Sequence, residues 1–118
     1  MTTADDAERV ALATAFEKEL YDDHRFLART TRYRAKAFLE AVARHGGVGA
    51  ARIVLQEPGT SDDLTRLGEL GKLAHSVEAT VLRPKYEALF SPDERRIARS
   101  RLESRGFDVD RFLGGLHT

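Results

Sequence analysis

The sequence has no cysteine among its 118 residues, which excludes disulfide bonds, thiolate zinc sites and a cysteine nucleophile. It has no apolar run near the roughly 20 residues that a transmembrane helix needs. Its first ten residues, MTTADDAERV, lack the basic stretch and following apolar stretch of a secretory signal. We therefore expect a soluble cytoplasmic protein with no membrane partner.

The net charge is zero, because 19 basic side chains balance 19 acidic ones. No overall electrostatic field therefore steers the protein towards nucleic acid. The two signs are nevertheless unevenly distributed along the chain. Residues 1–23 hold seven acidic and two basic side chains, whereas residues 24–54 hold one acidic and seven basic. We expect one domain over residues 1–118, with 1–23 as a peripheral acidic segment that either packs on the basic one or leaves it free to meet an anion.

The chain also lacks the alternating runs of β-branched and aromatic residues that mark strands and hairpins. Apolar residues recur instead at helical spacings, as at Leu12, Phe16, Leu20 and Leu27. We predict an all-α fold, a compact bundle of five to seven helices.

The segment Ala35–His45 has the least polar helical pattern in the chain, because its polar residues recur every four positions on one narrow stripe. We expect a helix over about 31–45 to be the buried centre of the bundle. Thr30-Thr31 predicts the boundary before this helix, and Gly46-Gly47 predicts its end.

Further helices are expected over 48–56, over about 64–70 and over 73–82, each bounded by glycine, proline or capping residues. The clearest local signal is Ser91-Pro92-Asp93-Glu94, which has the pattern of a capping box with proline at the first helical position. It predicts a helix to about Arg105, with Ile97, Ala98 and Leu102 facing inwards.

Three stretches follow one another in a recognisable order: FLEAVARHGGVGAARIVL, SDDLTRLGELGKLAHSVEATVL and YEALFSPDERRIARSRLESRGFD. In this order the chain, from Phe38 to about Val109, resembles a family of small uncharacterised bacterial proteins and appended modules. The family usually has an aromatic residue where this chain has Gly68. The resemblance implies a helical fold and implies no activity.

The basic segment provides a candidate nucleic-acid surface. Most of its cations would lie near one face if residues 24–45 were helical, and guanidinium groups at that spacing could follow phosphates. The alternative is that these basic residues form a solvent-exposed helix face whose charge balances that of the acidic segment. The candidate residues are Arg25, Arg29, Arg32, Arg34, Lys36 and Arg44. A second basic set, Arg95, Arg96, Arg99, Arg101 and Arg105, is interpreted as a solvent-exposed face.

Nothing in the sequence predicts a catalytic residue, a cofactor or a metal. His75 and Glu78 stand three residues apart, as in half of a carboxylate metal site, but no second such pair exists. Glu78 lies among apolar residues, so we expect it to be partly buried and to need Lys72, Arg66 or a helix N-terminus as its partner. An enzyme would require a deep polar pocket that gathers Glu78, His75 and another histidine.

The function that we expect first is a non-enzymatic helical interaction module that binds a protein partner or self-associates. Its expected interface is the apolar C-terminal set Phe107, Phe112, Leu113 and Leu116. The alternative is an accessory protein of nucleic acids or of the enzymes that act on them, which would use the basic segment. A stretch of glycines, Gly46, Gly47 and Gly49, is explained better by close helix packing than by anion binding.

Overall fold

Every regular element in the computed structural model is a helix over the residues that it describes, 4–57 and 62–115, which confirms the all-α prediction. The α-helices are α1 (Ala4–Thr30), α2 (Lys36–Gln56), α3 (Asp62–Glu69), α4 (Val77–Leu82), α5 (Pro92–Glu103) and α6 (Val109–Gly115). Two short 3-10 helices, η1 (Leu73–His75) and η2 (Pro84–Leu89), flank α4. Over these residues, no helix has both the length and the apolar character to cross a membrane.

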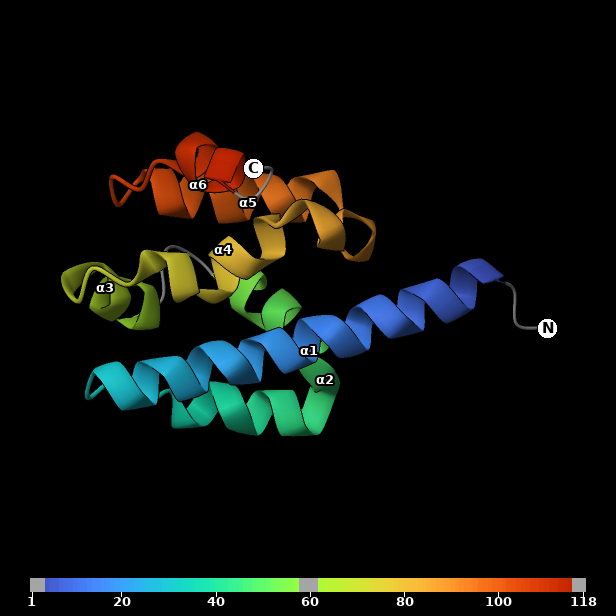
Figure 1. Cartoon of the computed structure of the whole chain (residues 1–118), viewed down its shortest axis with the longest axis horizontal. Helices are drawn as coiled ribbons and strands as arrows, with labels where there is room; N and C mark the ends of the chain where they lie inside the picture. The colour runs from blue at the N-terminus through green and yellow to red at the C-terminus, as the bar shows by residue number, and fades with distance from the viewer. Residues whose placement is uncertain (1–3, 58–61, 116–118) are drawn as a thin grey trace.

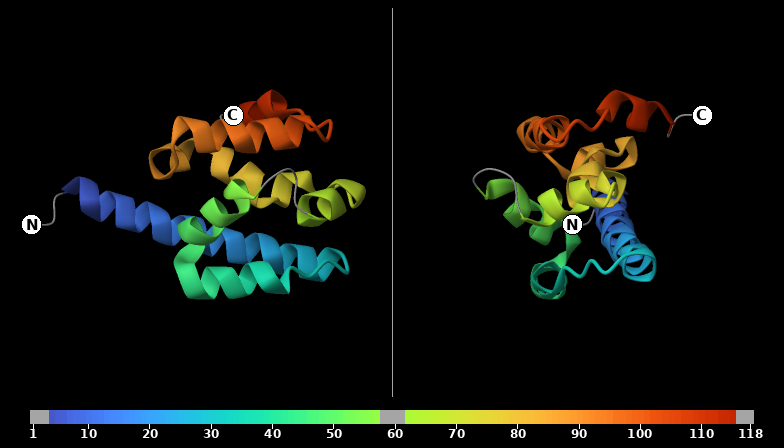
Figure 2. Two further views of the ribbon diagram at one scale, coloured as in Figure 1. Left: turned by 180° about the vertical axis from the view of Figure 1, so that it is seen from behind. Right: turned by 90° about the vertical axis from the view of Figure 1, so that its left-hand side faces the viewer.

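The helices are stacked in three levels (Figure 1). The paired helices α1 and α2 form one level, α3 and α4 lie across the middle, and α5 with α6 forms the far level. The views from behind and from the side show the same order (Figure 2). The radius of gyration is 14.0 Å, close to the roughly 13.5 Å expected for one compact domain of this length.

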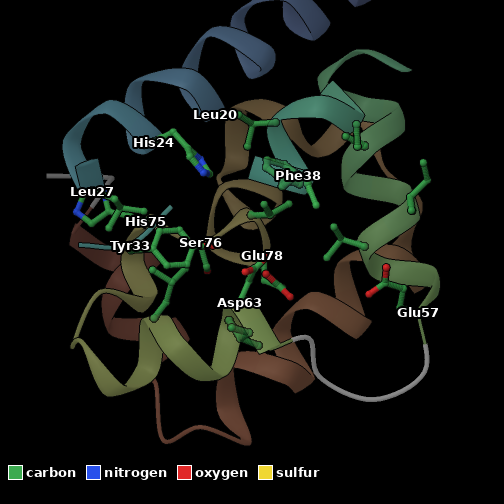
Figure 3. A pocket seen from close by; sticks show the side chains of 18 residues that line it. Leu20, His24, Leu27, Tyr33, Phe38, Glu57, Asp63, His75, Ser76 and Glu78 are labelled. Carbon is green, nitrogen blue, oxygen red and sulfur yellow. The ribbon is translucent and has the colours of Figure 1, made fainter. Parts of the chain in front are cut away.

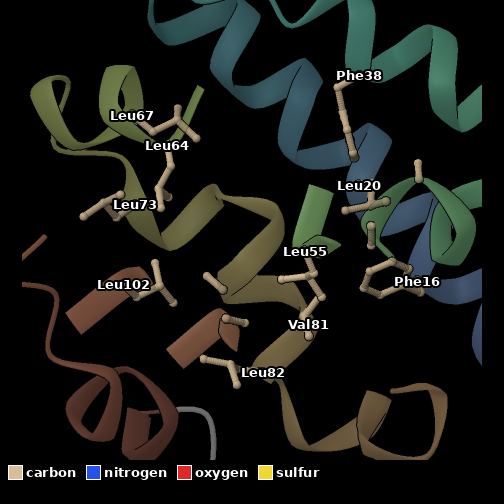
Figure 4. Close-up of a cluster of buried hydrophobic side chains, with 14 of the residues drawn as sticks. Phe16, Leu20, Phe38, Leu55, Leu64, Leu67, Leu73, Val81, Leu82 and Leu102 are labelled. Atoms are coloured by element: carbon tan, nitrogen blue, oxygen red, sulfur yellow. The ribbon is translucent and has the colours of Figure 1, made fainter. Parts of the chain in front are cut away.

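The most buried element is α4, which contacts α1, α2 and α5. Its residues from Glu78 to Leu82 are all buried. Apolar side chains from the surrounding helices converge on it (Figure 4). The prediction that Ala35–His45 is the buried centre is therefore wrong in position, although Phe38 and Val42 do reach the core.

The error arose because alanines were counted as core residues. Ala37 and Ala43 are exposed, and alanine suits exposed helix positions because it has the best helix propensity. Six residues of the segment are exposed in all: Lys36, Ala37, Glu40, Ala43, Arg44 and His45. Residues 31–35 are not helical, so the helix begins at Lys36.

Helix α1 runs unbroken for 27 residues and carries Leu12, Phe16, Leu20 and Leu27 along its length. Its apolar stripe is buried, with Phe16 at 0% exposure and Leu27 at 1%. Only residues 6–11 are exposed throughout, and this end projects beyond the bundle. The acidic segment is thus peripheral at its start and part of the core from Leu12 onwards.

The glycine pair divides α2 into two helical parts, as predicted, because Gly46 has a φ of 79° inside the element. Gly47 then lies directly against α1. A Cβ atom on Gly47 would come within 2.8 Å of the Cα atom of Glu17. The Glu17 carboxylate accepts a hydrogen bond of 2.8 Å from the Gly47 backbone N–H, so the protein's own acid occupies this helix start.

Two local predictions are wrong and one is confirmed in full. The predicted helix 73–82 is broken because Ser76 caps α4, its hydroxyl accepting a hydrogen bond from the Ala79 backbone N–H. Ile97 is 38% exposed, whereas Ala98 and Leu102 are buried. The capping box at the start of α5 has both of its reciprocal hydrogen bonds.

Candidate functional site

A cavity of about 260 Å³ lies between α1, α2, α3 and the start of α4 (Figure 3). Much of its wall is apolar and comes from Leu20, Leu27, Phe38, Ala50, Leu64 and Leu67. Polar side chains from five parts of the chain join this wall: His24, Tyr33, Glu57, Asp63, His75, Ser76 and Glu78. Ile53, Glu57 and Asp63 are the exposed residues nearest its α2–α3 side and mark its mouth.

Glu78 carries the most buried charge on the cavity wall, with 2% of the residue exposed. Burial raises the pKa of its carboxyl group, and the backbone N–H of the first turn and the nearby Arg101 guanidinium oppose this shift. The Arg101 Nη1 atom lies 3.7 Å from Glu78 Oε2, an ion-pair distance that is too long for a hydrogen bond. Glu78 Oε2 has no hydrogen-bond partner among the described residues.

Arg101 gives its hydrogen bonds elsewhere, to the end of α2. Its guanidinium donates to the carbonyl oxygens of Val54 at 2.8 Å and Leu55 at 3.3 Å, and also to that of Glu57. It thereby serves carbonyls that have no partner within α2 and brings positive charge to the negative end of that helix. Arg101 is the cation beside Glu78, whereas the sequence predicted Lys72 or Arg66. The backbone N–H at the start of α4 also lowers the pKa of Glu78, in line with the predicted helix N-terminus.

His24 and Tyr33 form a second polar group on the wall. The His24 ring lies 5.9 Å from the Phe38 ring and 5.9 Å from the Tyr33 ring, centroid to centroid. Burial lowers the pKa of His24, opposed by Asp63 and Asp23. Its Nε2 atom is buried and has no hydrogen-bond partner among the described residues. The neutral imidazole is therefore left with an unused polar atom at the cavity.

Asp63 links these groups electrostatically from the mouth. Burial raises the pKa of Tyr33, and both the charge of Asp63 and its hydrogen bond with the tyrosine add to the rise. The same carboxylate also acts on His24 and on Glu78. Asp63 therefore faces the same space as Glu78, although the two residues come from different helices.

His75 completes the polar wall and is held by α1. Its Nδ1 atom lies 3.0 Å from Asp23 Oδ1, and the Thr80 hydroxyl donates to the other oxygen of Asp23 at 3.2 Å. The His75 ring stacks on Phe26 with centroids 4.3 Å apart. Over the described residues, no group of three or more potential metal ligands comes together. His75 and Glu78 thus have separate partners.

The basic segment is not one helical stripe, because the chain turns between α1 and α2. Arg25 pairs with Asp22, and Arg34 donates to the backbone oxygens of Thr31 and Tyr33. The remaining members are exposed and form no ion pair within the described part of the chain: Arg29, Arg32, Lys36 and Arg44. We call Arg29, Arg32 and Lys36, which surround the α1–α2 connection, the basic end.

The arginines of α5 are not a uniform solvent-exposed face, which corrects the second prediction. Arg101 is 7% exposed, and Arg95 donates to the backbone oxygens of Val81 and Leu82 at the end of α4. Arg99 bridges to Asp110 of α6 at 3.0 Å. Only Arg96 is exposed with a partner from its own helix, Asp93.

The C-terminal apolar set is mostly turned towards the body of the protein. Phe107, Phe112 and Leu113 are half-buried and pack against the core, while Leu116 lies outside the described residues. The Arg83 guanidinium lies 5.7 Å from the centre of the Phe112 ring. The predicted interface is thus partly covered by the chain itself.

Spacing in the sequence does not reveal the cavity, because its polar residues lie in five separate segments. His75 and Glu78 were recognised from their i,i+3 spacing, but Tyr33 and Asp63 had no comparable signal. Comparison with protein-family models, with curated proteins and with solved structures gave no match.

Proposed function

We propose that the protein binds a small amphipathic molecule in the cavity between α1, α2, α3 and α4. One observation carries the proposal. Four buried polar atoms of the described residues lack a hydrogen bond, and two of them, on Glu19 and Arg83, lie 2.9 Å apart in an ion pair. The other two, Glu78 Oε2 and His24 Nε2, both belong to residues that line this cavity.

Unpartnered buried polar atoms are uncommon in folded proteins, because each costs about 1–3 kcal/mol. A ligand that brings hydrogen-bonding groups to these two atoms would recover part of that free energy. Binding sites of this kind are concave and mostly apolar, with a few convergent polar groups. The cavity combines these features.

The size of the space also supports a ligand. A cavity of roughly 150 Å³ lined by apolar side chains accepts benzene. At about 260 Å³ this cavity has room for a benzene-sized body with a short polar substituent.

Binding rather than catalysis is proposed, although the cavity gathers Glu78, His75 and a second histidine. A nucleophile beside a general base is the usual requirement for covalent catalysis. Ser76 is the lining serine next to these groups in the chain, and its hydroxyl donates to the Leu73 backbone oxygen and caps α4. The hydroxyl is thus engaged in holding the fold.

The test is a ¹H–¹⁵N NMR titration with 2-phenylethanol, a neutral probe of suitable size. We expect shifts at cavity residues such as His24 and Ala50. Ala41→Leu fills the cavity and should abolish these shifts, whereas Ala43→Leu, an exposed change on the same helix, should leave them intact. Absence of shifts in the wild type, or equal binding by Ala41→Leu, would reject the proposal.

A second candidate is binding of nucleic acid through the basic end, which is favoured because Arg29, Arg32 and Lys36 are exposed and form no ion pair with any described residue. A fluorescent DNA duplex should bind at low salt and dissociate as salt rises. Changing all three cations to alanine should lower the slope of log K against log salt by about 2.7 if each contacts a phosphate. The C-terminal protein interface ranks behind both, because its described residues are half-buried. No duplex binding at low salt would exclude the second candidate.

A further inference from the structure

The geometry points to a small organic cation, a protonated amine on a compact apolar body, as the class of ligand that the cavity takes. This inference rests on the proposed function and specifies the ligand. It is carried by the signs of the charges around the cavity, by the hydrogen bonds left open and by the aromatic wall.

The charged side chains that line the cavity are of one sign. Glu57, Asp63 and Glu78 are carboxylates, and the lining residues within the described chain include no Lys or Arg. Arg101 lies beyond Glu78, where three backbone oxygens already accept its hydrogen bonds. These three carboxylates would therefore attract a cation placed in the cavity and repel an anion.

Asp63 and Glu78 act on each other across this space. Burial is the main cause of the raised pKa of Glu78, and the negative charge of Asp63 adds to the rise, as expected for two carboxylates that line one cavity. Asp63 is exposed at the mouth and Glu78 is buried at the wall. An ammonium group between them would turn a repulsive pair into two attractive contacts.

The open hydrogen-bonding positions favour a donor. An ammonium group has three N–H donors and no acceptor, and Glu78 Oε2 is an acceptor that receives no hydrogen bond from the residues that the structure describes. A bond between an ammonium group and a carboxylate is charge-assisted and roughly twice as strong as one between neutral groups. A hydroxyl would gain only the weaker kind.

The remainder of the wall fits the rest of such a molecule. The rings of His24, Tyr33 and Phe38 lie together, and faces of aromatic rings attract cations. The aliphatic side chains of Leu20, Leu27 and Leu64 bound the apolar part of the space. The labelled side chains are seen to converge in Figure 3.

The experiment compares three probes of nearly equal shape: phenethylamine, 2-phenylethanol and phenylacetate. They differ in charge at neutral pH, being positive, neutral and negative. Isothermal titration calorimetry and NMR on the intact chain should rank them in that order. We expect the amine to bind at least about tenfold more tightly than the alcohol, from one charge-assisted bond.

Asp63→Asn tests the inference because it removes the charge of Asp63 and keeps a side-chain oxygen that can accept the hydrogen bond from Tyr33. It should reduce the preference for the amine over the alcohol at least about threefold, because one of the two facing charges is lost. Glu69→Gln makes the same change of charge on α3 outside the cavity and should leave the preference unchanged. Glu78→Gln should remove most of the preference.

The outcomes separate the two proposals. If the alcohol binds as tightly as the amine, or if Asp63→Asn keeps the full preference, the cation inference is overturned while binding in the cavity stands. If phenylacetate binds most tightly, the inference is likewise overturned. If none of the three probes binds the wild type, the proposed function fails and the inference fails with it.

Discussion

The basic residues of α5 and those of the basic end are mostly arginines, but they lie in different environments. On α5, Arg101 and Arg95 reach inwards and donate to the last backbone oxygens of α2 and α4. At the basic end, Arg29 and Arg32 remain exposed and have no ion pair within the described residues. The position of helix ends, rather than the spacing of the arginines, decides which of them become structural.

The reason lies in the ends of helices. The last four carbonyl groups of an α-helix have no partner within it, and together they form the negative end of the helix dipole. Helix α5 passes beside two such ends, those of α2 and α4, so its guanidinium groups complete both. Arg52 of α2 does the same at the end of η2, where it donates to the Leu89 backbone oxygen at 2.9 Å.

The largest effect should come from Arg101→Met. The change removes three hydrogen bonds to backbone oxygens and leaves the buried Glu78 without its cation. Loss of one partner of a buried pair destabilises a protein by about 3–5 kcal/mol. Urea denaturation followed by circular dichroism measures the free energy of unfolding.

Arg96→Met is the matched control, because Arg96 is exposed on the same helix and, among the described residues, forms an ion pair only with Asp93. It should change the free energy of unfolding by less than about 0.5 kcal/mol. Equal effects of the two substitutions would contradict the contrast between buried and exposed arginines on α5.

A smaller effect is expected from Arg95→Met, which tests the second helix end. Arg95 is half-buried and donates to Val81 at 2.9 Å and to Leu82 at 3.1 Å. Leaving these backbone oxygens without partners should cost about 1–3 kcal/mol of unfolding free energy in the same urea experiment. A loss as large as that of Arg101→Met would mean that the ion pair with Glu78 contributes nothing extra.

The pH dependence of stability examines the ion pair from its acidic side. Burial raises the pKa of Glu78 above the value of about 4.3 in an unfolded chain, despite Arg101 nearby. An acid whose pKa is higher in the folded state than in the unfolded state contributes stability that is complete below its unfolded pKa. This contribution is lost as pH rises through its folded pKa. The free energy of unfolding of the wild type relative to Glu78→Gln should therefore fall as pH rises above about 4.

Glu103→Gln provides the comparison, as an exposed acid on α5, and its pH profile relative to the wild type should lack this fall. The charged groups that act on Glu78 are Arg101 on α5 and Asp63 on α3. If the relative stability instead rose with pH, Arg101 would outweigh burial, and the unpartnered Glu78 Oε2 would lose its significance.

Local features of this fold could be predicted from the sequence, and features that join distant segments could not. The capping box at Ser91 and the break at Gly46 depend on residues next to each other in the chain, and both are present. The burial of Glu78 followed from its apolar neighbours. Its partner Arg101 did not, since no periodicity shows that α5 passes the end of α2.

The candidate site was harder to predict for the same reason. Tyr33 lies in the non-helical connection and Asp63 at the start of α3, and only the packing of α1, α2 and α4 brings them to Glu78. The prediction that Ala35–His45 is the buried centre was wrong for another reason, because alanine is compatible with both core and surface positions. A pattern that counts Ala37 and Ala43 as buried overstates the core.

The smallest effect on stability should come from replacing the basic end, Arg29, Arg32 and Lys36, with alanine. No described acid pairs with these side chains, and alanine has a higher helix propensity than either basic residue, which favours the helical positions Arg29 and Lys36. We expect each change to shift the free energy of unfolding by less than about 0.5 kcal/mol, measured by urea denaturation. Arg34 stays unchanged in this variant because it holds the connection through two backbone oxygens.

A large loss of stability would show that the basic end is structural like the α5 arginines, and the contrast between the two regions would disappear. An unchanged stability combined with lost duplex binding would mean that cations free of structural contacts are the ones available to a partner.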